Sequence, residues 1–390
     1  MKIFMSAFVI ATSFSSHLSA CSDVFINQGT YHIEARTLDF LVNIAFQDKM
    51  GFVGEENTTD VVLDAEKIPS SQLTSWKNKY GYFGRTAFGQ NIIDGMNTEG
   101  LSVSILYMPG SKYPIYDNKD KKQVLSVYDI ASYILSQART VPEGIKLIRS
   151  RQIIESAVKV KDGYFVKDIP IHYVMRDKKG NSAVIEFIDG QVKIYENAGD
   201  VLTNSPPLDW QIQNASYYDS LLAGNKHANK KFSKTFHNYD EIYKTISHVG
   251  EANLMGLPGD YTPPSRFVRA KVLLNNFPAP TNRQVALYQA SSLNDSLLVP
   301  AVKGAAPTLW ISIKDLDDNV YYVKNIVLYQ ENRNLFPMPI TSGYTTYDLK
   351  SIDFNIAGPL QTKIKVEPTN PKEIKEIVSA DSIKIAGVIQ

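Results

Sequence analysis

The stretch that decides the fold is Leu18-Ser19-Ala20-Cys21-Ser22-Asp23, which holds the only cysteine among 390 residues. If the chain is cleaved before Cys21, this residue gains a free α-amino group, whose ordinary pKa of about 7.7 to 8.0 suits a base near neutrality. A thiol nucleophile and an amine base then share one residue. We therefore expect the rest of the chain to form a scaffold around Cys21.

The segment before Cys21 has the three-part layout of a secretory signal peptide: Met1-Lys2, a mostly apolar run from Ile3 to Phe14, and the small residues Ser19-Ala20. The apolar run is too short for a membrane span, and no later segment approaches the roughly 20 apolar residues that a spanning helix needs. We expect export of a bacterial protein to the periplasm or the medium, without a membrane span. The expected division is a signal peptide (1–20), one catalytic domain (21–354) and a tail rich in Lys, Glu and Pro (355–390).

Composition and missing motifs argue against several classes of protein. Forty-one basic and 40 acidic residues, without a dense basic run, give no electrostatic footprint for nucleic acid. The chain has no Gly-x-Ser-x-Gly, phosphate-binding loop, His-Glu-x-x-His or cysteine pair, so we expect no cofactor and no metal. Its six histidines offer few partners for a Cys-His dyad, which favours the α-amino group as the base for Cys21.

Alternating and helical hydrophobic patterns predict a layered α+β domain. A tight turn at Asn27-Gln28-Gly29-Thr30 joins two strands of a hairpin that begins at Cys21. A polar insertion at 223–239 contains His227 and His237, which we interpret as surface residues. The expected helices are Ser126 to Ala138, Val141 to Ile154 and Thr281 to Leu297, and the main later strands are Leu101 to Tyr107, Ile171 to Met175, Ser182 to Ile188, Gln191 to Tyr195, Thr308 to Ile313 and Asn319 to Leu328.

The opening stretch has a second interpretation, because Leu18-Ser19-Ala20-Cys21 also fits the bacterial lipoprotein pattern. In that case the thiol of Cys21 would carry lipid and its amine would be blocked, so Cys21 could not be catalytic. The protein would then be a membrane-anchored binding or structural module. This stretch alone leaves both interpretations open.

Six short matches, in chain order, carry a resemblance to a known family. They are Cys21-Ser22, Ala35-Arg36-Thr37-Leu38-Asp39-Phe40, Asp94-Gly95-Met96-Asn97-Thr98-Glu99-Gly100-Leu101, Leu106-Tyr107, Leu202-Thr203-Asn204-Ser205-Pro206 and the run from Gly256 to Phe267. In these residues the chain resembles the choloylglycine hydrolase family of N-terminal-nucleophile amidases, which includes bile salt hydrolases and penicillin V acylases.

The resemblance implies a four-layer αββα sandwich with the cysteine at the end of a central strand. It also implies hydrolysis of a linear amide in an N-acyl substrate through an acyl-thioester. Conjugated bile salts, penicillin V and N-acyl homoserine lactones all join an apolar acyl group to a small polar amine, and the sequence does not choose among them. The stretch between Asn204 and Arg266 is as long as in relatives that form tetramers through a protruding segment, so a homo-oligomer is a further expectation.

The resemblance also assigns roles around the nucleophile. Cys21 is expected to attack the amide carbonyl, with its own α-amino group as the base. Asp39 is expected to orient that amine, and Arg36 to lie near the sulfur, where a positive charge favours the thiolate. The spacing of 15 residues from Cys21 to Arg36 is one fewer than in close relatives, and a register slip in the hairpin would turn Arg36 away.

Three more residues receive roles in the same way. Asn204 and the backbone N–H of Tyr107 are expected to form an oxyanion hole, and Arg266 to complete the polar cluster. Tyr107 stands where bile salt hydrolases usually carry Asn and penicillin V acylases carry Tyr, which favours an acylase-like preference. Each residue also has an ordinary interpretation: a surface ion pair for Arg36 and Asp39, a plain turn for Asn204-Ser205-Pro206, a packed aromatic for Tyr107, and a capping or solvated charge for Arg266.

Overall fold

The computed structural model describes residues 19–40, 46–59, 68–87, 91–159, 165–166, 168–219, 254, 256–300, 306–329 and 338–356. The expected signal peptide up to residue 18, the polar insertion at 223–239 and most of the tail lie outside these residues. The division into signal peptide, domain and tail therefore stays a prediction.

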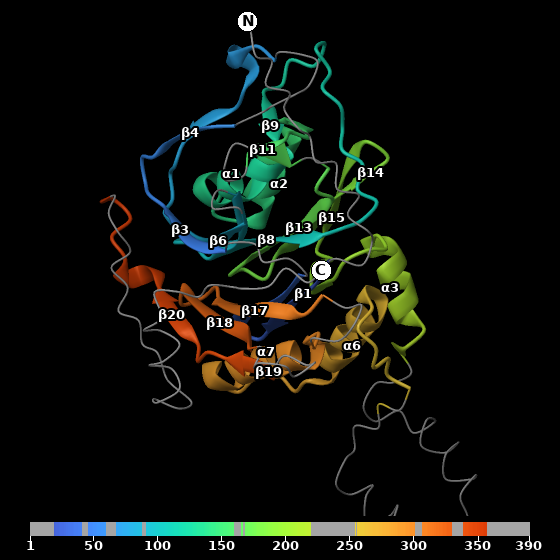
Figure 1. Ribbon diagram of the computed structural model, residues 1–390. Coiled ribbons are helices and arrows are strands. Elements are labelled where there is room, and N and C mark those ends of the chain that lie inside the picture. Colours follow the sequence, from blue (N-terminus) through green and yellow to red (C-terminus); the bar gives the residue numbers. More distant parts are fainter. Residues whose placement is uncertain are drawn as a thin grey trace, which may run out of the picture.

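Two antiparallel seven-stranded sheets form the centre of the molecule (Figure 1). The β1 sheet has the order β16 (Val201–Leu202), β1 (Ser19–Gln28), β2 (Tyr31–Phe40), β17 (Thr308–Asp315), β18 (Val320–Tyr329) and β19 (Met338–Thr341), with β20 (Thr345–Asp348) also beside β18. The β8 sheet has the order β15 (Gln191–Glu196), β14 (Ser182–Ile188), β13 (Ile171–Asp177), β8 (Leu101–Tyr107), β7 (Asn91–Asn97), β6 (Tyr82–Ala87) and β3 (Gln47–Gly51).

Helices cover the outer face of each sheet, which gives four layers (Figure 1). Helices α1 (Ile130–Gln137) and α2 (Val141–Arg149) pack on the β8 sheet, and α6 (Pro263–Asn276) and α7 (Arg283–Leu297) pack on the β1 sheet, with α3 (Leu208–Ser216) beside α6. Small strand pairs lie outside the sheets: β4 (Glu56–Thr58) with β5 (Ser75–Lys77), β9 (Val124–Ser126) with β10 (Gln152–Ile154), and β11 (Val158–Lys159) with β12 (Phe165–Val166). The predicted four-layer αββα sandwich is confirmed.

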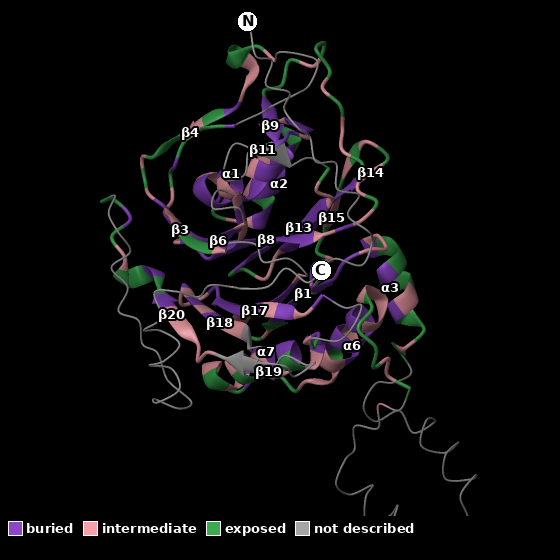
Figure 2. Cartoon of the chain, viewed as in Figure 1, coloured by how far each residue is buried: buried purple, intermediate pink, exposed green. Residues whose placement is uncertain are grey.

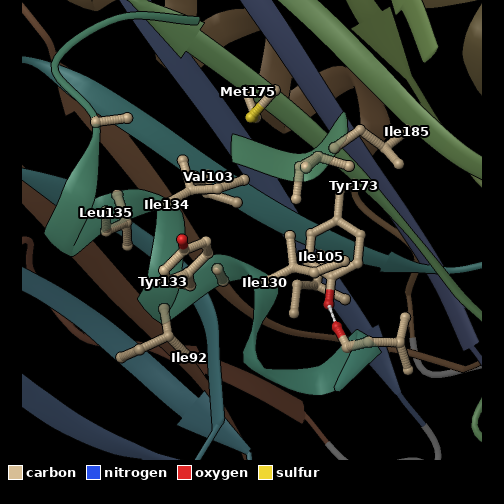
Figure 3. Close-up of a cluster of buried hydrophobic side chains, with 14 of the residues drawn as sticks. Ile92, Val103, Ile105, Ile130, Tyr133, Ile134, Leu135, Tyr173, Met175 and Ile185 are labelled. Atoms are coloured by element: carbon tan, nitrogen blue, oxygen red, sulfur yellow. Dashed lines mark hydrogen bonds between the residues drawn. The ribbon is translucent and has the colours of Figure 1, made fainter. Parts of the chain in front are cut away.

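Apolar side chains fill the space between α1 and the β8 sheet (Figure 3). Val103 of β8 lies beside Ile134 of α1, and Ile105 of β8 lies beside Tyr173 of β13, whose hydroxyl donates to the carbonyl oxygen of Val127; all four side chains named first are buried. Burial of each large apolar side chain contributes about 1.5–3 kcal/mol. Most residues of the two sheets are buried, as are residues on the sides of the helices that face the sheets (Figure 2). This packing fixes the strands whose ends carry the polar residues described below.

The predicted β1–β2 hairpin is present, but β1 begins at Ser19 rather than at Cys21, and Asn27 and Gln28 belong to the strand rather than to the turn. Gln28 pairs with Tyr31 across the two-residue loop Gly29-Thr30, and Gly29 has a φ of 67°, which a two-residue hairpin loop requires and glycine adopts readily. The register places Asp23 directly opposite Arg36. Arg36 is therefore not turned away by a slip, although its spacing from Cys21 is short.

Two predicted helices differ in extent from the structure. The helix expected from Ser126 begins only at Ile130, after β9 and a short 3₁₀ turn. The helix expected from Val141 to Ile154 ends at Arg149, because Gln152–Ile154 pairs with β9 as a parallel strand. No helix within the described residues combines the length and apolar character that crossing a membrane requires.

Helices α3 and α6 were not predicted at all. Pro263 and Pro264 suggest a turn, but they occupy the first turn of α6, where a missing N–H costs no hydrogen bond. This correction matters for the site, because Arg266 lies in the first turns of α6.

Candidate active site

The polar residues around Cys21 come from distant parts of the chain and meet where several strands end. Cys21 lies near the start of β1, Asp39 near the end of β2, and Tyr107 at the end of β8. Asn204 follows β16, and Arg266 reaches the site from α6. Because β1 begins at Ser19, the Ala20–Cys21 peptide bond lies within the strand, and Ala20 pairs with Asp39.

Asn204 binds the backbone of Cys21. Its side-chain oxygen Oδ1 accepts hydrogen bonds from the backbone N–H of Cys21 at 2.7 Å and from Nη2 of Arg266 at 2.9 Å. Its Nδ2 donates to the carbonyl oxygen of Tyr107 at 2.6 Å. Two donors on one oxygen fix which way the amide group points. The plain-turn interpretation of Asn204 is therefore wrong.

Arg266 binds the carbonyl group of Cys21, on the same side of the strand as Asn204. Nη1 donates to the carbonyl oxygen of Cys21 at 2.7 Å and to the hydroxyl of Ser22. Nε donates to the carbonyl oxygen of Tyr261 at 3.0 Å. The side chain is fully buried, so the alternative interpretation of Arg266 as a solvated charge is wrong. Ser22 was not predicted as part of the site, although it directly follows the cysteine.

Asp39 is buried beside Arg266, with 3.7 Å between Oδ2 and Nη1. The hydroxyl of Thr308 donates to Oδ1 at 2.5 Å, a contact that the sequence did not indicate. Burial raises the pKa of Asp39 to about 7, although Arg266 and Thr308 both oppose the rise. Asp39 can therefore change its charge near neutral pH.

Arg36 approaches from the opposite face of the β1 sheet. Strand residues three apart point to opposite faces, so Arg36 faces the β8 sheet while Asp39 faces α6. The guanidinium of Arg36 donates to the carbonyl oxygens of Ile93 and Ile105 and lies 5.3 Å from the ring centroid of Trp310. Both charged residues are fully buried, so the surface ion-pair interpretation is wrong.

The thiol and the backbone of Cys21 thus have different neighbours. Residues directly opposite each other in the hairpin share a face, and Cys21 pairs with Leu38, two residues from Arg36. The thiol therefore lies on the face of Arg36, whereas Asn204 and Arg266 bind the backbone N–H and carbonyl.

Buried side chains hold the loop that carries Asn204, and the sequence analysis did not single them out for this role. Gln211 of α3 donates to the carbonyl oxygen of Asn204 at 2.9 Å. Nε2 of His172 lies 2.9 Å from the carbonyl oxygen of Thr203, the preceding residue. No short sequence motif links these positions, because β13 and α3 reach the loop only in the folded chain.

Three buried carboxylates, Asp23, Glu34 and Asp94, could in principle hold a metal ion, since their ligand atoms lie within 4.8 Å of one another. Protein cations already bind them: Arg176 pairs with Asp23, and Nζ of Lys314 lies 2.6 Å from Glu34 and pairs with Asp94. The cluster is therefore an ion-pair network between the sheets.

Comparison with known proteins agrees with this arrangement. Residues 21–334 match the model of a family described as linear amide C-N hydrolases, choloylglycine hydrolase family. A penicillin V acylase of Pectobacterium atrosepticum is 26% identical over 304 residues, which cover 75% of this chain and 72% of that protein. A bile salt hydrolase/transferase of Clostridium perfringens is 27% identical over 192 residues, and the match spans about half of each chain (46% and 51%).

Solved structures show the same fold. The penicillin V acylase of Agrobacterium tumefaciens superimposes with a TM-score of 0.61 at 22% identity and covers 86% of this chain and 87% of its own. A variant of the conjugated bile acid hydrolase of Clostridium perfringens also superimposes with a TM-score of 0.61, at 18% identity, and the match covers 90% of this chain and 97% of that protein. The match extends over most of the chain and begins at Cys21. The chain therefore belongs to the choloylglycine hydrolase family and is an amidohydrolase of the choloylglycine hydrolase and penicillin V acylase type.

Proposed function

We propose that the protein hydrolyses the amide bond of an N-acyl substrate with Cys21 as an N-terminal nucleophile, once the Ala20–Cys21 bond has been cut. The observation that carries this proposal is how the backbone of Cys21 is bound. The N–H and C=O of a strand residue point to the same side, toward the neighbouring strand. Here β16 pairs only with Asp23 and Val24, and Asn204 and Arg266 take its place beside Cys21. Any buried backbone group needs a partner, and here the partners are an amide and a guanidinium, which stay in place beside a free amine at Cys21.

The backbone nitrogen of Cys21 is placed to act as a base after cleavage. A free amine in the same position can donate one N–H to Oδ1 of Asn204, now 2.7 Å away, and use its lone pair to accept the thiol proton. Asp39, beside Arg266 on the same face, is the carboxylate expected to orient the amine. Arg36 lies on the thiol's face, where its charge favours the thiolate.

The amide of Asn204 supports the proposed oxyanion hole. Its Nδ2 carries two N–H bonds, and the carbonyl oxygen of Tyr107 accepts one of them. The second N–H can stabilise the negative oxygen that forms on the substrate, a contact typically worth about 3–4 kcal/mol at the transition state. The contribution of the Tyr107 backbone N–H stays a prediction, since the contact described above uses its carbonyl oxygen.

The reaction proceeds in two steps. The thiolate of Cys21 attacks the amide carbonyl, and the tetrahedral oxyanion collapses with breakage of the C–N bond. The leaving amine takes the proton that the α-amino group received from the thiol. Water then attacks the thioester and gives a proton to the α-amino group of Cys21. The acid is released, and the α-amino group returns the proton to the departing thiolate, which restores the thiol.

Two observations favour an acylase-like substrate among the open classes. Tyr107 occupies the position where, by resemblance, penicillin V acylases carry Tyr. The match to a penicillin V acylase also covers 75% of this chain, compared with 46% for the bile salt hydrolase/transferase. We therefore place penicillin V before conjugated bile salts and N-acyl homoserine lactones.

A panel of substrates tests the proposal. Protein that begins at Cys21 is incubated with penicillin V, a glycine-conjugated bile salt and an N-acyl homoserine lactone, and released amine is measured. We expect turnover of at least one substrate, no turnover by Cys21→Ala and little by Cys21→Ser. Hydrolysis by Cys21→Ala at the wild-type rate would exclude the mechanism.

A further inference from the structure

The space between the two sheets contains a group of charges that the mechanism above does not use. Glu34, Arg176 and Lys314 are at most 1% exposed, as are Asp23 and Asp94. Buried charges are costly unless they are paired and hydrogen-bonded. With Arg36 the group has three basic and three acidic side chains, and Arg36 is the member assigned to Cys21. The group is therefore connected to the reacting thiol through one residue.

Asp94 of β7 is the most extensively bound carboxylate of the group. Its Oδ1 accepts hydrogen bonds from the hydroxyl of Ser104 at 2.7 Å and from the ammonium of Lys314. Its Oδ2 accepts from the hydroxyl of Ser312 at 2.6 Å and from the hydroxyl of Tyr321. Burial alone would raise the pKa of Asp94, but Lys314 and Arg36 hold it well below its ordinary value. Asp94 is therefore an anion with a fixed orientation.

Asp94 and its neighbour Ile93 bind the guanidinium of Arg36 together. Nη1 of Arg36 lies 3.4 Å from Oδ1 of Asp94 and donates to the carbonyl oxygen of Ile93. Burial alone would lower the pKa of Arg36, but Asp94 and Cys21 hold it above its ordinary value. Among the described residues, Asp94 is the carboxylate within ion-pair distance of Arg36.

We infer that Asp94 is a positioning residue for the reaction, which holds the guanidinium of Arg36 in place beside the Cys21 thiol and is itself held by Lys314, Ser312 and Tyr321. The inference rests on the proposed function, since it assigns to Arg36 the stabilisation of the thiolate. Asp94 touches neither the thiol nor its backbone in the contacts described, so its effect must pass through Arg36.

A double-mutant cycle tests this inference. Protein that begins at Cys21 is compared with Asp94→Asn, Arg36→Met and the double variant. The readout is the pH midpoint of Cys21 alkylation by iodoacetamide, and the lone cysteine makes this signal specific. We expect Asp94→Asn to raise the midpoint, because a displaced guanidinium stabilises the thiolate less. We expect no rise when Asp94→Asn is added to Arg36→Met, because only the electrostatic effect of the lost anion, which lowers the midpoint, remains in that background.

The charges that face Arg36 decide how the midpoint is interpreted. Asp94 on β7, Asp23 on β1 and the phenol of Tyr321 on β18 act on Arg36 directly. Glu34 on β2, Arg85 on β6, Arg176 on β13 and Lys314 on β17 act on these groups or on one another. Loss of an anion alone would lower the thiol midpoint by electrostatics. A midpoint that falls in Asp94→Asn would thus show that Asp94 acts only as an opposing charge, and would overturn the inference. An equal rise with and without Arg36 would overturn it as well.

Glu34→Gln is the matched control. Glu34 is buried in the same group and also binds Lys314, but its ion pairs are with Lys314 and Arg176. We expect its effect on the midpoint to be the same in the wild-type and Arg36→Met backgrounds. If the effect of Glu34→Gln on the midpoint disappeared in the Arg36→Met background, any charge of the group would act through Arg36. That result would contradict a specific role for Asp94.

Milder variants keep the test available if Asp94→Asn does not fold. Ser312→Ala and Tyr321→Phe each remove one donor to Oδ2 of Asp94 and change no charge. Each should raise the alkylation midpoint by less than Asp94→Asn and have no effect in Arg36→Met. An unchanged midpoint in both would overturn the inference. Because alkylation needs no substrate, this result is separate from the outcome of the substrate panel, which alone tests the proposed function.

Discussion

Burial controls the charge of Asp39, which lies beside Arg266 and faces α6. Its pKa is raised to about 7 in the folded chain from an ordinary value of 3.8. Between these values the unfolded chain has released the proton that the folded chain still binds. The free energy of unfolding therefore falls as pH rises through this range. The loss of stability reaches its full size above the pKa of Asp39 in the folded chain.

Asp39→Asn should remove this pH dependence in the uncleaved chain. The variant should gain stability relative to the wild type as pH rises from about 4 to 7, by up to about 4 kcal/mol. Urea unfolding at several pH values measures the difference. Asp189→Asn, at an exposed residue, should follow the wild-type pH profile. Parallel profiles for Asp39→Asn and the wild type would contradict the raised pKa.

Asn204 should affect turnover more than substrate binding, because the second N–H of its Nδ2 is proposed to stabilise the oxyanion, which forms only in the transition state. Asn204→Ala should lower kcat by about 100- to 1000-fold with a smaller change in KM. Steady-state kinetics on the best substrate of the panel measure this split. Gln213→Ala, at an exposed position on α3, should retain the wild-type kcat. A rise in KM with kcat unchanged would assign Asn204 to ground-state binding instead.

At the scale of elements, β6 and β7 approach closely at two opposed glycines, next to Asp94. Gly84 pairs with Gly95, and a Cβ at Gly84 would lie 2.5 Å from the carbonyl oxygen of Asp94. Backbone in the middle of a sheet cannot move aside easily. We expect Gly84→Ala to destabilise the fold by about 1–3 kcal/mol, measured by urea unfolding.

Gly259→Ala is the control for this change, because a Cβ there meets no atom within 4 Å. It should change the free energy of unfolding far less than Gly84→Ala. Equal stability of the two variants would mean that the β6–β7 contact tolerates a side chain, and the close packing around Asp94 would not be required.

The accuracy of the sequence predictions differed between kinds of element. The β1–β2 hairpin was predictable because apolar strand residues flank a turn that contains Gly29, but its start at Ser19 and its two-residue loop were not. Helix α6 was missed because Pro263-Pro264 suggests a turn as readily as a first helical turn. Lys314 and Ser312 alternate along β17 with apolar residues, which is typical of a strand with one face in water. In the folded chain that face packs against the β8 sheet.

The site itself could be predicted in part. Cys21, Arg36, Asp39, Asn204 and Arg266 lie in matches to a family, so the residues were predictable while their contacts were not. Asn204 lies 183 residues from Cys21 along the chain, and only the packing of β16 and α6 brings its side chain to the backbone nitrogen. Thr308, which binds Asp39, and Lys314, Ser312 and Tyr321, which bind Asp94, had no local signal, because each reaches its partner through its position in a sheet.

For the whole molecule, the state of the N-terminus decides between an amidohydrolase with an N-terminal nucleophile and a lipoprotein. In the structure, which includes the residues before Cys21, Cys21 is only 1% exposed. We expect the intact mass of protein purified from an exporting bacterium to correspond to a chain that begins with an unmodified Cys21. A diacylglycerol adduct on this residue would contradict the proposed mechanism.

The central claim is that the α-amino group of Cys21 is the base for its own thiol. The most direct measurement compares the rate of amine release by protein that begins at Cys21 with that of the same protein retaining Ala20. An amide nitrogen at Cys21 still donates to Asn204 but cannot accept a proton, so we expect the extended protein to be at least about 100-fold slower. Equal rates for the two proteins would contradict the claim.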